Sequence, residues 1–167
     1  MICATEWKSE RTCAMLAGNG GMTVQILVDA DACPVLVIIR RVGAAAGVRV
    51  VTVSSFRHEI GGPDHVMVGP ESQAADMAII NRTVRGDVVV TQDWGLAALV
   101  LGKGAHALSP WGHRFRDDEM DGRLAQRAMN ARLRRGGVRL PGPKRRTTED
   151  DRAFADALER LLAEISR

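Results

Sequence analysis

Four aspartates lie where predicted strands end and predicted helices begin. Asp29 and Asp31 directly follow the first apolar run of the chain, and Asp93 lies two residues past the end of the β-branched run VVVT. Asp76 lies in about the first turn of the helix expected after the third strand. Converging carboxylates repel one another unless a cation compensates them, and loose clusters of oxygen ligands suit Mg²⁺ or Mn²⁺. Such an ion can activate water and stabilise the leaving oxygen of a phosphodiester.

Each of these aspartates taken alone also has a simpler explanation. Asp29 or Asp31 could cap the helix that starts near Pro34, and Asp93 could cap the helix that follows it. Ligands of open α/β sheets, however, bind beyond the carboxyl ends of the strands. Asp87 begins a strand and belongs to the opposite edge, so we exclude it. Because several carboxylates are expected at one edge, the sequence favours a metal site.

The elements that position these residues alternate between short apolar strands and helices. Strands are predicted at 24–28, 48–53, 65–68, 87–91 and 105–108, and helices at 35–46, 72–84 and 94–101. Ser72 is the expected cap of the second helix. This alternation is typical of a sheet covered on both faces. The predicted fold class is α/β: a three-layer sandwich with a mostly parallel sheet, followed by C-terminal helices.

The two ends of the chain differ in character. Residues 117–135 and 148–165 are predicted helices, separated by the Gly- and Pro-rich loop 136–146. Residues 1–21 show no periodicity, and Met22 lies just before the first strand. We therefore expect residues 1–22 to be an extension, either disordered or translated from a start codon assigned too early, and residues 23–167 to form a single domain.

The composition of the 167 residues excludes several classes of protein. No apolar run reaches the 18 or more residues of a membrane span, and charged residues interrupt the N-terminus where a secretory signal would lie. The three cysteines form no CxxC pair, which argues against a zinc ribbon or a disulfide scaffold. We expect a cytoplasmic protein without a membrane partner.

A basic segment suggests a polyanionic partner. Nine of the 23 Lys and Arg residues lie between Gly122 and Thr148, where the sequence has no acidic residue. Such a segment suits RNA, although a solvated helix and loop would explain it equally well. The candidates to contact the RNA backbone are Arg132, Arg134, Arg135, Lys144, Arg145 and Arg146. With no Tyr, three Trp and three Phe, base stacking is not expected to dominate binding.

Five segments of the chain resemble the YaiI/YqxD family of bacterial proteins. They are VDADACPV (28–35), QAADMAI (73–79), VVVTQDWGLAA (88–98), GAHALSPWGHRF (104–115) and GPKRRTTEDDRAF (142–154). The likeness spans about residues 23–165. The family looks PIN-like, and PIN domains are compact α/β domains related to metal-dependent ribonucleases.

The resemblance implies roles for particular residues. Asp29, Asp31, Asp76 and Asp93 map onto the acidic cluster that holds Mg²⁺ or Mn²⁺ in PIN-like nucleases. Ser55 and His58, in the segment VSSFRH, fall in what looks like a family motif and are candidates to bind substrate. An ordinary surface position would suit His58 equally well. Gln73 stands where some relatives carry a further aspartate, which makes this cluster one acid poorer.

Three functions remain open from the sequence. The leading one is a metal-dependent ribonuclease, with Asp29 and Asp93 as principal ligands and with Asp31 and Asp76 completing the site. The second is a non-catalytic RNA-binding module with a vestigial acidic site. The third is a haloacid-dehalogenase-type phosphatase, which the DxD pattern suggests but Cys33 disfavours, because that family normally carries Thr or Val at this position.

Overall fold

The computed structural model describes residues 24–31, 33–55, 62, 64–69, 71, 73–119, 122, 129, 132, 135 and 145–166. Its elements are β1 (Gln25–Asp29), α1 (Leu36–Ala46), β2 (Arg49–Ser55), β3 (His65–Val68), α2 (Ala74–Arg82), β4 (Val88–Val90), α3 (Trp94–Gly102), β5 (His106–Leu108) and α5 (Thr148–Ile165). In the predicted helix 117–135, the described residues 117–119, 122, 129, 132 and 135 are helical. The predicted extension 1–22 and most of the loop 136–146 lie outside the described residues.

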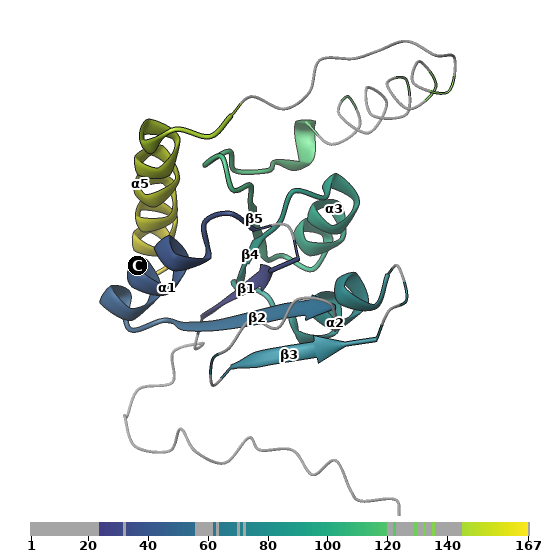
Figure 1. Ribbon diagram of the computed structural model, residues 1–167, viewed down its shortest axis with the longest axis horizontal. Coiled ribbons are helices and arrows are strands. Elements are labelled where there is room, and N and C mark those ends of the chain that lie inside the picture. The colour runs from purple at the N-terminus through teal and green to yellow at the C-terminus, as the bar shows by residue number, and fades with distance from the viewer. Residues whose placement is uncertain are drawn as a thin grey trace, which may run out of the picture.

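The five strands form one sheet in the order β3-β2-β1-β4-β5, and every pair of neighbouring strands is parallel. Helices cover both faces of the sheet (Figure 1). The predicted α/β fold class with a mostly parallel sheet is confirmed. No helix in the described part of the chain is both long and apolar enough to cross a membrane.

Alternating side chains of the central strands divide the core into two layers. Ile26 and Val28 of β1 face α1 and α5, where Phe154 is fully buried. Leu27, between them in sequence, faces the other side, where it packs with Ile79 of α2 and with residues of α3. This is the period-two alternation of a strand that is buried on both faces. The core thus fixes β1 and β4 in the middle of the molecule.

The order of the strands reverses next to β1. From β1 the chain passes through α1 to β2 on one side, whereas from β4 it passes through α3 to β5 on the other. The carboxyl ends of β1 and β4 therefore flank a topological switch point, the position at which open α/β sheets bind ligands. Asp29 is the last residue of β1 and lies at this point.

One prediction about a helix end was wrong, and one alternative considered for the aspartates is ruled out. The N-cap of α2 is Gln73 rather than Ser72, and the Gln73 side chain makes no capping hydrogen bond. The N-cap of α1 is Val35, again with no side-chain cap, so neither Asp29 nor Asp31 caps that helix. These two aspartates are therefore available for other contacts.

Candidate functional site

The structure brings the four predicted aspartates to the carboxyl edge of the sheet. Asp29 ends β1, Asp31 follows two residues later, Asp76 lies in the first turn of α2, and Asp93 is the N-cap of α3. Asp76, Asp31 and Asp93 all act on the pKa of Asp29, which shows that the four charges share one neighbourhood. We refer to these four residues as the aspartate cluster.

A buried threonine joins two members of the cluster. The Thr91 hydroxyl donates a hydrogen bond to Oδ2 of Asp29 at 3.1 Å and accepts one from the backbone N–H of Asp93 at 3.0 Å. Thr91 is only 1% exposed, so its rotamer is fixed by packing. The sequence analysis did not identify this residue. The sequence feature that could have identified Thr91 is its position, directly after a strand and two residues before Asp93.

Asp93 has the capping role considered for it from the sequence and is also a member of the aspartate cluster. Its Oδ1 accepts hydrogen bonds from the backbone N–H groups of Gly95 at 2.6 Å and Leu96 at 3.4 Å, which makes it a true N-cap of α3. The same carboxylate lies close enough to Asp29 and Asp76 to act on their pKa values. The positive end of the helix dipole favours a negative charge at this position.

Asp31 is held by the end of β2. The Ser55 backbone N–H donates to both carboxylate oxygens, at 2.9 and 3.1 Å, and the Ser55 hydroxyl donates to Oδ1 at 3.2 Å. The structure thus places Ser55, a predicted substrate-binding residue, against a member of the cluster and shows it orienting that carboxylate. His58 lies outside the described residues.

Burial and repulsion by neighbouring carboxylates both disfavour ionisation of Asp29 and Asp76. Burial raises the pKa of Asp29, the hydrogen bond from Thr91 lowers it, and the charges of Asp76, Asp31 and Asp93 raise it further. Burial also raises the pKa of Asp76, with an additional contribution from Asp93. A divalent cation among these carboxylates would reverse the repulsion and favour the ionised forms.

The described side chains do not form a metal site that is enclosed by protein ligands. Among the residues that the structure describes, no three His, Cys, Asp or Glu side chains are arranged to hold a metal ion together. Mg²⁺, however, keeps several waters and is commonly bound through one or two carboxylates. The carboxylates of the cluster are hard oxygen donors, the ligand type that Mg²⁺ and Mn²⁺ prefer.

Cys33 lies beside the cluster without the properties of a nucleophile. Burial raises the pKa of its thiol to about 11, and the charge of Asp29 raises it too, whereas Arg146 lowers it. The thiol stays protonated at neutral pH, and Cys33 packs against the core cluster of α1 and α5. The interpretation of Cys33 as a small packed residue agrees with this environment.

The basic candidates occupy different environments. Arg132, Arg135 and Arg145 are exposed, whereas Arg134 and Lys144 lie outside the described residues. The Arg146 side chain is only 16% exposed and forms an ion pair with Asp151. Its Nη1 donates to the carbonyl of Pro110 at 2.7 Å. Arg146 is therefore engaged within the protein, between α5 and the loop after β5.

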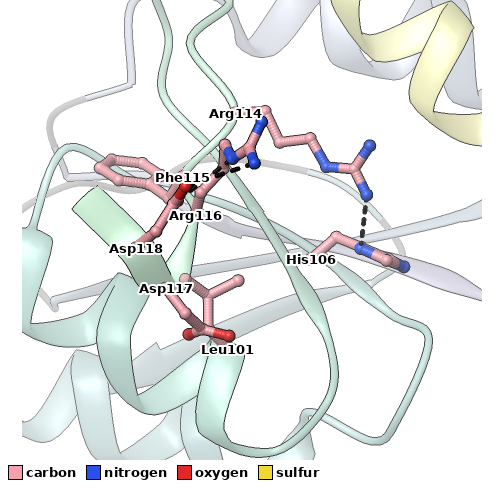
Figure 2. Close-up of a pocket in the computed structure, with 7 residues that line it drawn as sticks. All are labelled: Leu101, His106, Arg114, Phe115, Arg116, Asp117 and Asp118. Atoms are coloured by element: carbon pink, nitrogen blue, oxygen red, sulfur yellow. Dashed lines mark hydrogen bonds and ion pairs between the residues drawn. The ribbon is translucent and has the colours of Figure 1, made fainter. Parts of the chain in front are cut away.

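An open pocket of about 480 Å³ lies elsewhere, and none of the four aspartates lines it (Figure 2). It is lined by Leu101, His106, Arg114, Phe115, Arg116, Asp117 and Asp118. His106 is the first residue of β5, so the pocket extends toward the amino end of that strand. There Arg114 contacts His106 at 3.3 Å and pairs with Glu164 of α5. The pocket is thus separate from the aspartate cluster.

Fold and site together define an α/β protein with clustered carboxylates at the switch point of a parallel sheet. Residues 27–164 match DUF188, described as "Uncharacterized BCR, YaiI/YqxD family". The chain therefore belongs to the YaiI/YqxD family, which confirms the resemblance noted in its sequence. No solved structure matches the chain.

Several curated relatives cover nearly the same length. A UPF0178 protein of Heliobacterium modesticaldum is 48% identical over 143 residues, which is 84% of this chain and 98% of the relative. A UPF0178 protein of Alkaliphilus metalliredigens is 42% identical and covers 83% of this chain and 92% of the relative. A UPF0178 protein of Clostridium acetobutylicum is 40% identical and covers 83% of this chain and 97% of the relative. These names state no activity.

Proposed function

We propose that this protein is a metal-dependent ribonuclease whose active site is the aspartate cluster. The observation that carries the proposal is the electrostatic coupling of Asp29 to Asp76, Asp31 and Asp93 at the switch point of the sheet. Asp31 and Asp93 also accept structural hydrogen bonds, from Ser55 and from the start of α3, yet their charges still raise the pKa of Asp29. The PIN-like character that the family resemblance implies points to the same chemistry.

In this mechanism Asp29 and Asp93 would hold a Mg²⁺ or Mn²⁺ ion, and Asp31 and Asp76 would complete or orient the site. The bound ion supplies Lewis acidity toward the phosphodiester. Thr91 helps to keep Asp29 ionised, because a hydrogen bond to a carboxylate favours its charged form. Ser55 holds Asp31 from the other side of β1, so the ends of three neighbouring strands fix the relative positions of the acids.

RNA is the proposed substrate because phosphodiester hydrolysis suits the acids and a basic segment can bind the backbone. Arg132, Arg135 and Arg145 are exposed and provide positive charge for phosphates. Binding through such contacts is sequence-independent and weakens steeply as salt concentration rises. A salt-sensitive affinity is therefore part of the proposal.

The test is cleavage of a panel of RNAs and single-stranded DNA in Mn²⁺, Mg²⁺ or EDTA. The proteins compared are the wild type, Asp29→Asn and Asp93→Asn, with Asp156→Asn as the matched control. Asp156 is an exposed aspartate of α5 outside the cluster. Thermal unfolding of each variant accompanies the assay, because Asp93 also caps α3.

We expect metal-dependent cleavage of RNA that the Asp156→Asn variant retains and the Asp29→Asn variant loses. Cleavage that survives in both cluster variants would come from a contaminant and would overturn the proposal. Metal-independent RNA retention without cleavage, unchanged in Asp29→Asn, would instead identify a binding module with a vestigial acidic site.

A further inference from the structure

The loop after β5 contains a tight turn that presents a tryptophan at the surface. The Ser109 hydroxyl accepts hydrogen bonds from the backbone N–H groups of Trp111 at 3.3 Å and His113 at 3.1 Å. Within the same turn, Gly112 N–H donates to the Ser109 carbonyl at 2.9 Å, and Ser109 N–H donates to the His113 carbonyl at 2.8 Å. Four hydrogen bonds thus fix the backbone on both sides of Trp111.

Packing against α5 holds this turn in place. Gly112 adopts φ +80°, and a Cβ there would lie 3.0 Å from the carbonyl oxygen of Ala153, so a larger residue would be strained and crowded. Arg146, paired with Asp151, donates to the carbonyl of Pro110 at 2.7 Å. The position of Trp111 is therefore set by α5 as well as by its own turn.

Trp111 combines this rigidity with exposure. The guanidinium carbon of Arg146 lies 5.2 Å from the centre of the ring and covers one of its faces, yet 39% of the residue remains exposed. Trp94, by contrast, packs edge-on against Phe115 with ring centres 4.5 Å apart. A fixed, partly exposed indole loses little conformational freedom on binding and can stack on a nucleobase.

The turn lies at the same edge of the sheet as the aspartate cluster. Val28, Val90 and Leu108 are in register across three neighbouring parallel strands. Asp29 directly follows the first of these residues, and the turn follows the last, at a lateral spacing of two strands, or about 10 Å. Arg146, which covers one face of the Trp111 ring, donates to the carbonyl of Pro110, two residues after the end of β5, so its guanidinium also lies at this edge.

We infer that Trp111 stacks on a base of the substrate and that this substrate is single-stranded RNA. The inference rests on the proposed ribonuclease function, which it deepens by naming the form of the RNA. Bases within a duplex stack on one another, so only an unpaired base can offer its face to an indole ring. Arg146 is a positioning residue in this arrangement, since its guanidinium supports the ring from the opposite face.

The experiment measures RNA binding separately from cleavage. Asp29→Asn protein in EDTA is titrated into a fluorescently labelled, unstructured RNA of about 12 nucleotides, and into a duplex of the same length, with anisotropy as the readout. Trp111→Ala and Trp111→Phe are compared in this background. Leu99→Ala is the matched control, because Leu99 is 57% exposed on α3 and takes no part in the proposed site.

We expect Trp111→Ala to weaken single-strand binding by about 5- to 150-fold, the range of one lost base–aromatic stack. Trp111→Phe keeps most of the affinity, Leu99→Ala keeps all of it, and the duplex binds more weakly than the single strand. Absence of binding, equal affinity of Trp111→Ala and Trp111→Phe, or a duplex bound as tightly as the single strand would overturn the inference.

A parallel cleavage assay separates this inference from the proposed function. It uses the same single-stranded RNA and proteins that keep Asp29, with and without the Trp111 substitutions. Trp111-dependent binding without metal-dependent cleavage would overturn the ribonuclease and keep the stacking role. Cleavage with binding that does not depend on Trp111 would overturn the stacking role and keep the ribonuclease.

Discussion

Aspartates at the two edges of the sheet have different surroundings. Asp87, directly before β4, is 1% exposed and accepts hydrogen bonds from the Gln25 backbone and side chain, at 3.2 and 3.0 Å, and from Val84 N–H at 2.9 Å. Asp29, at the other end of the neighbouring strand, accepts from the Thr91 hydroxyl and lies near three other carboxylates. Asp87 therefore has three hydrogen-bond donors around it, whereas Asp29 has one donor and three neighbouring like charges.

This difference is the one expected between a structural carboxylate and, under the proposed function, a catalytic one. The hydrogen bonds to Asp87 satisfy this buried carboxylate and tie β1 to the turn before β4. Burial and like charges oppose the charge of Asp29, so that residue is not optimised for stability. Functional sites commonly retain such unfavourable arrangements because ligand binding requires them. Exchanging each aspartate for asparagine should therefore have opposite consequences.

The largest expected effect is on catalysis. Asp29→Asn should lower RNA cleavage by more than about 100-fold, beyond the loss of about 10- to 100-fold typical of groups that only support a metal ligand. Asp87→Asn should cleave at nearly the wild-type rate, because Asp87 lies at the opposite edge. Initial rates in Mn²⁺, measured well below the Tm of each variant, give the comparison. Equal losses of cleavage rate in Asp29→Asn and Asp87→Asn would show that the aspartates at the two edges do not differ in function.

The next effect is on stability at the opposite edge. Asp87→Asn should lower the free energy of unfolding by about 2 kcal/mol, since a charge-assisted hydrogen bond contributes about 1.5–3 kcal/mol. Urea denaturation measures this loss, and Asp156→Asn is the exposed control. A loss no larger than that of the control would show that the three donors do not depend on the charge of Asp87.

Thr91 should have an intermediate effect through Asp29. Thr91→Val removes the hydroxyl that lowers the pKa of Asp29, so the acidic limb of the cleavage profile should move to higher pH and the rate should fall by about 10-fold. Thr91→Ser keeps the hydroxyl and should restore both properties. The pH profile of kcat/KM is the measurement, and an unchanged acidic limb in Thr91→Val would remove Thr91 from the site.

The smallest expected effect is the change that the charge of Asp29 makes in the stability of the folded protein. Because the pKa of Asp29 is raised in the native state, the native protein binds a proton more readily than the unfolded chain does. Stability should therefore decline as pH rises from about 3.9, the ordinary pKa of aspartate, through the raised value. In metal-free buffer above this interval, Asp29→Asn should raise Tm by about 2–4 °C, the shift that ~1 kcal/mol produces in a domain of this size.

This gain should vanish below that pH interval, where Asp29 is protonated in both states. Thermal unfolding across pH measures it. A lower Tm for Asp29→Asn at neutral pH without metal would show that the carboxylate stabilises the fold instead of straining it.

The sequence predicted most of the fold because each strand carries its own signal. The bounds of β3 agree with the predicted residues, and Asp29 and Asp93 were placed at one edge because the carboxyl ends of parallel strands coincide. The cap of α2 was misplaced, since Ser72 has the preferred residue type but the helix begins after Gln73. Local residue preferences did not settle where the loop enters the helix.

Contacts between distant segments could not be predicted in the same way. The bond from Thr91 to Asp29 joins residues 62 positions apart and depends on the pairing of β1 with β4. The contact of Arg146 with the loop that carries Trp111 depends on how α5 docks against the sheet. No spacing rule along the chain reports such docking, so both features became visible only in the structure.

Binding of Mn²⁺ tests the central claim most directly, because it precedes any chemistry. Titration monitored by the electron paramagnetic resonance of free Mn²⁺ compares the wild type with Asp29→Asn and Asp87→Asn. The account predicts that Asp87→Asn binds the ion as the wild type does and that Asp29→Asn loses at least about 10-fold in affinity. Equal binding by the wild type and Asp29→Asn, or binding by neither, would contradict it.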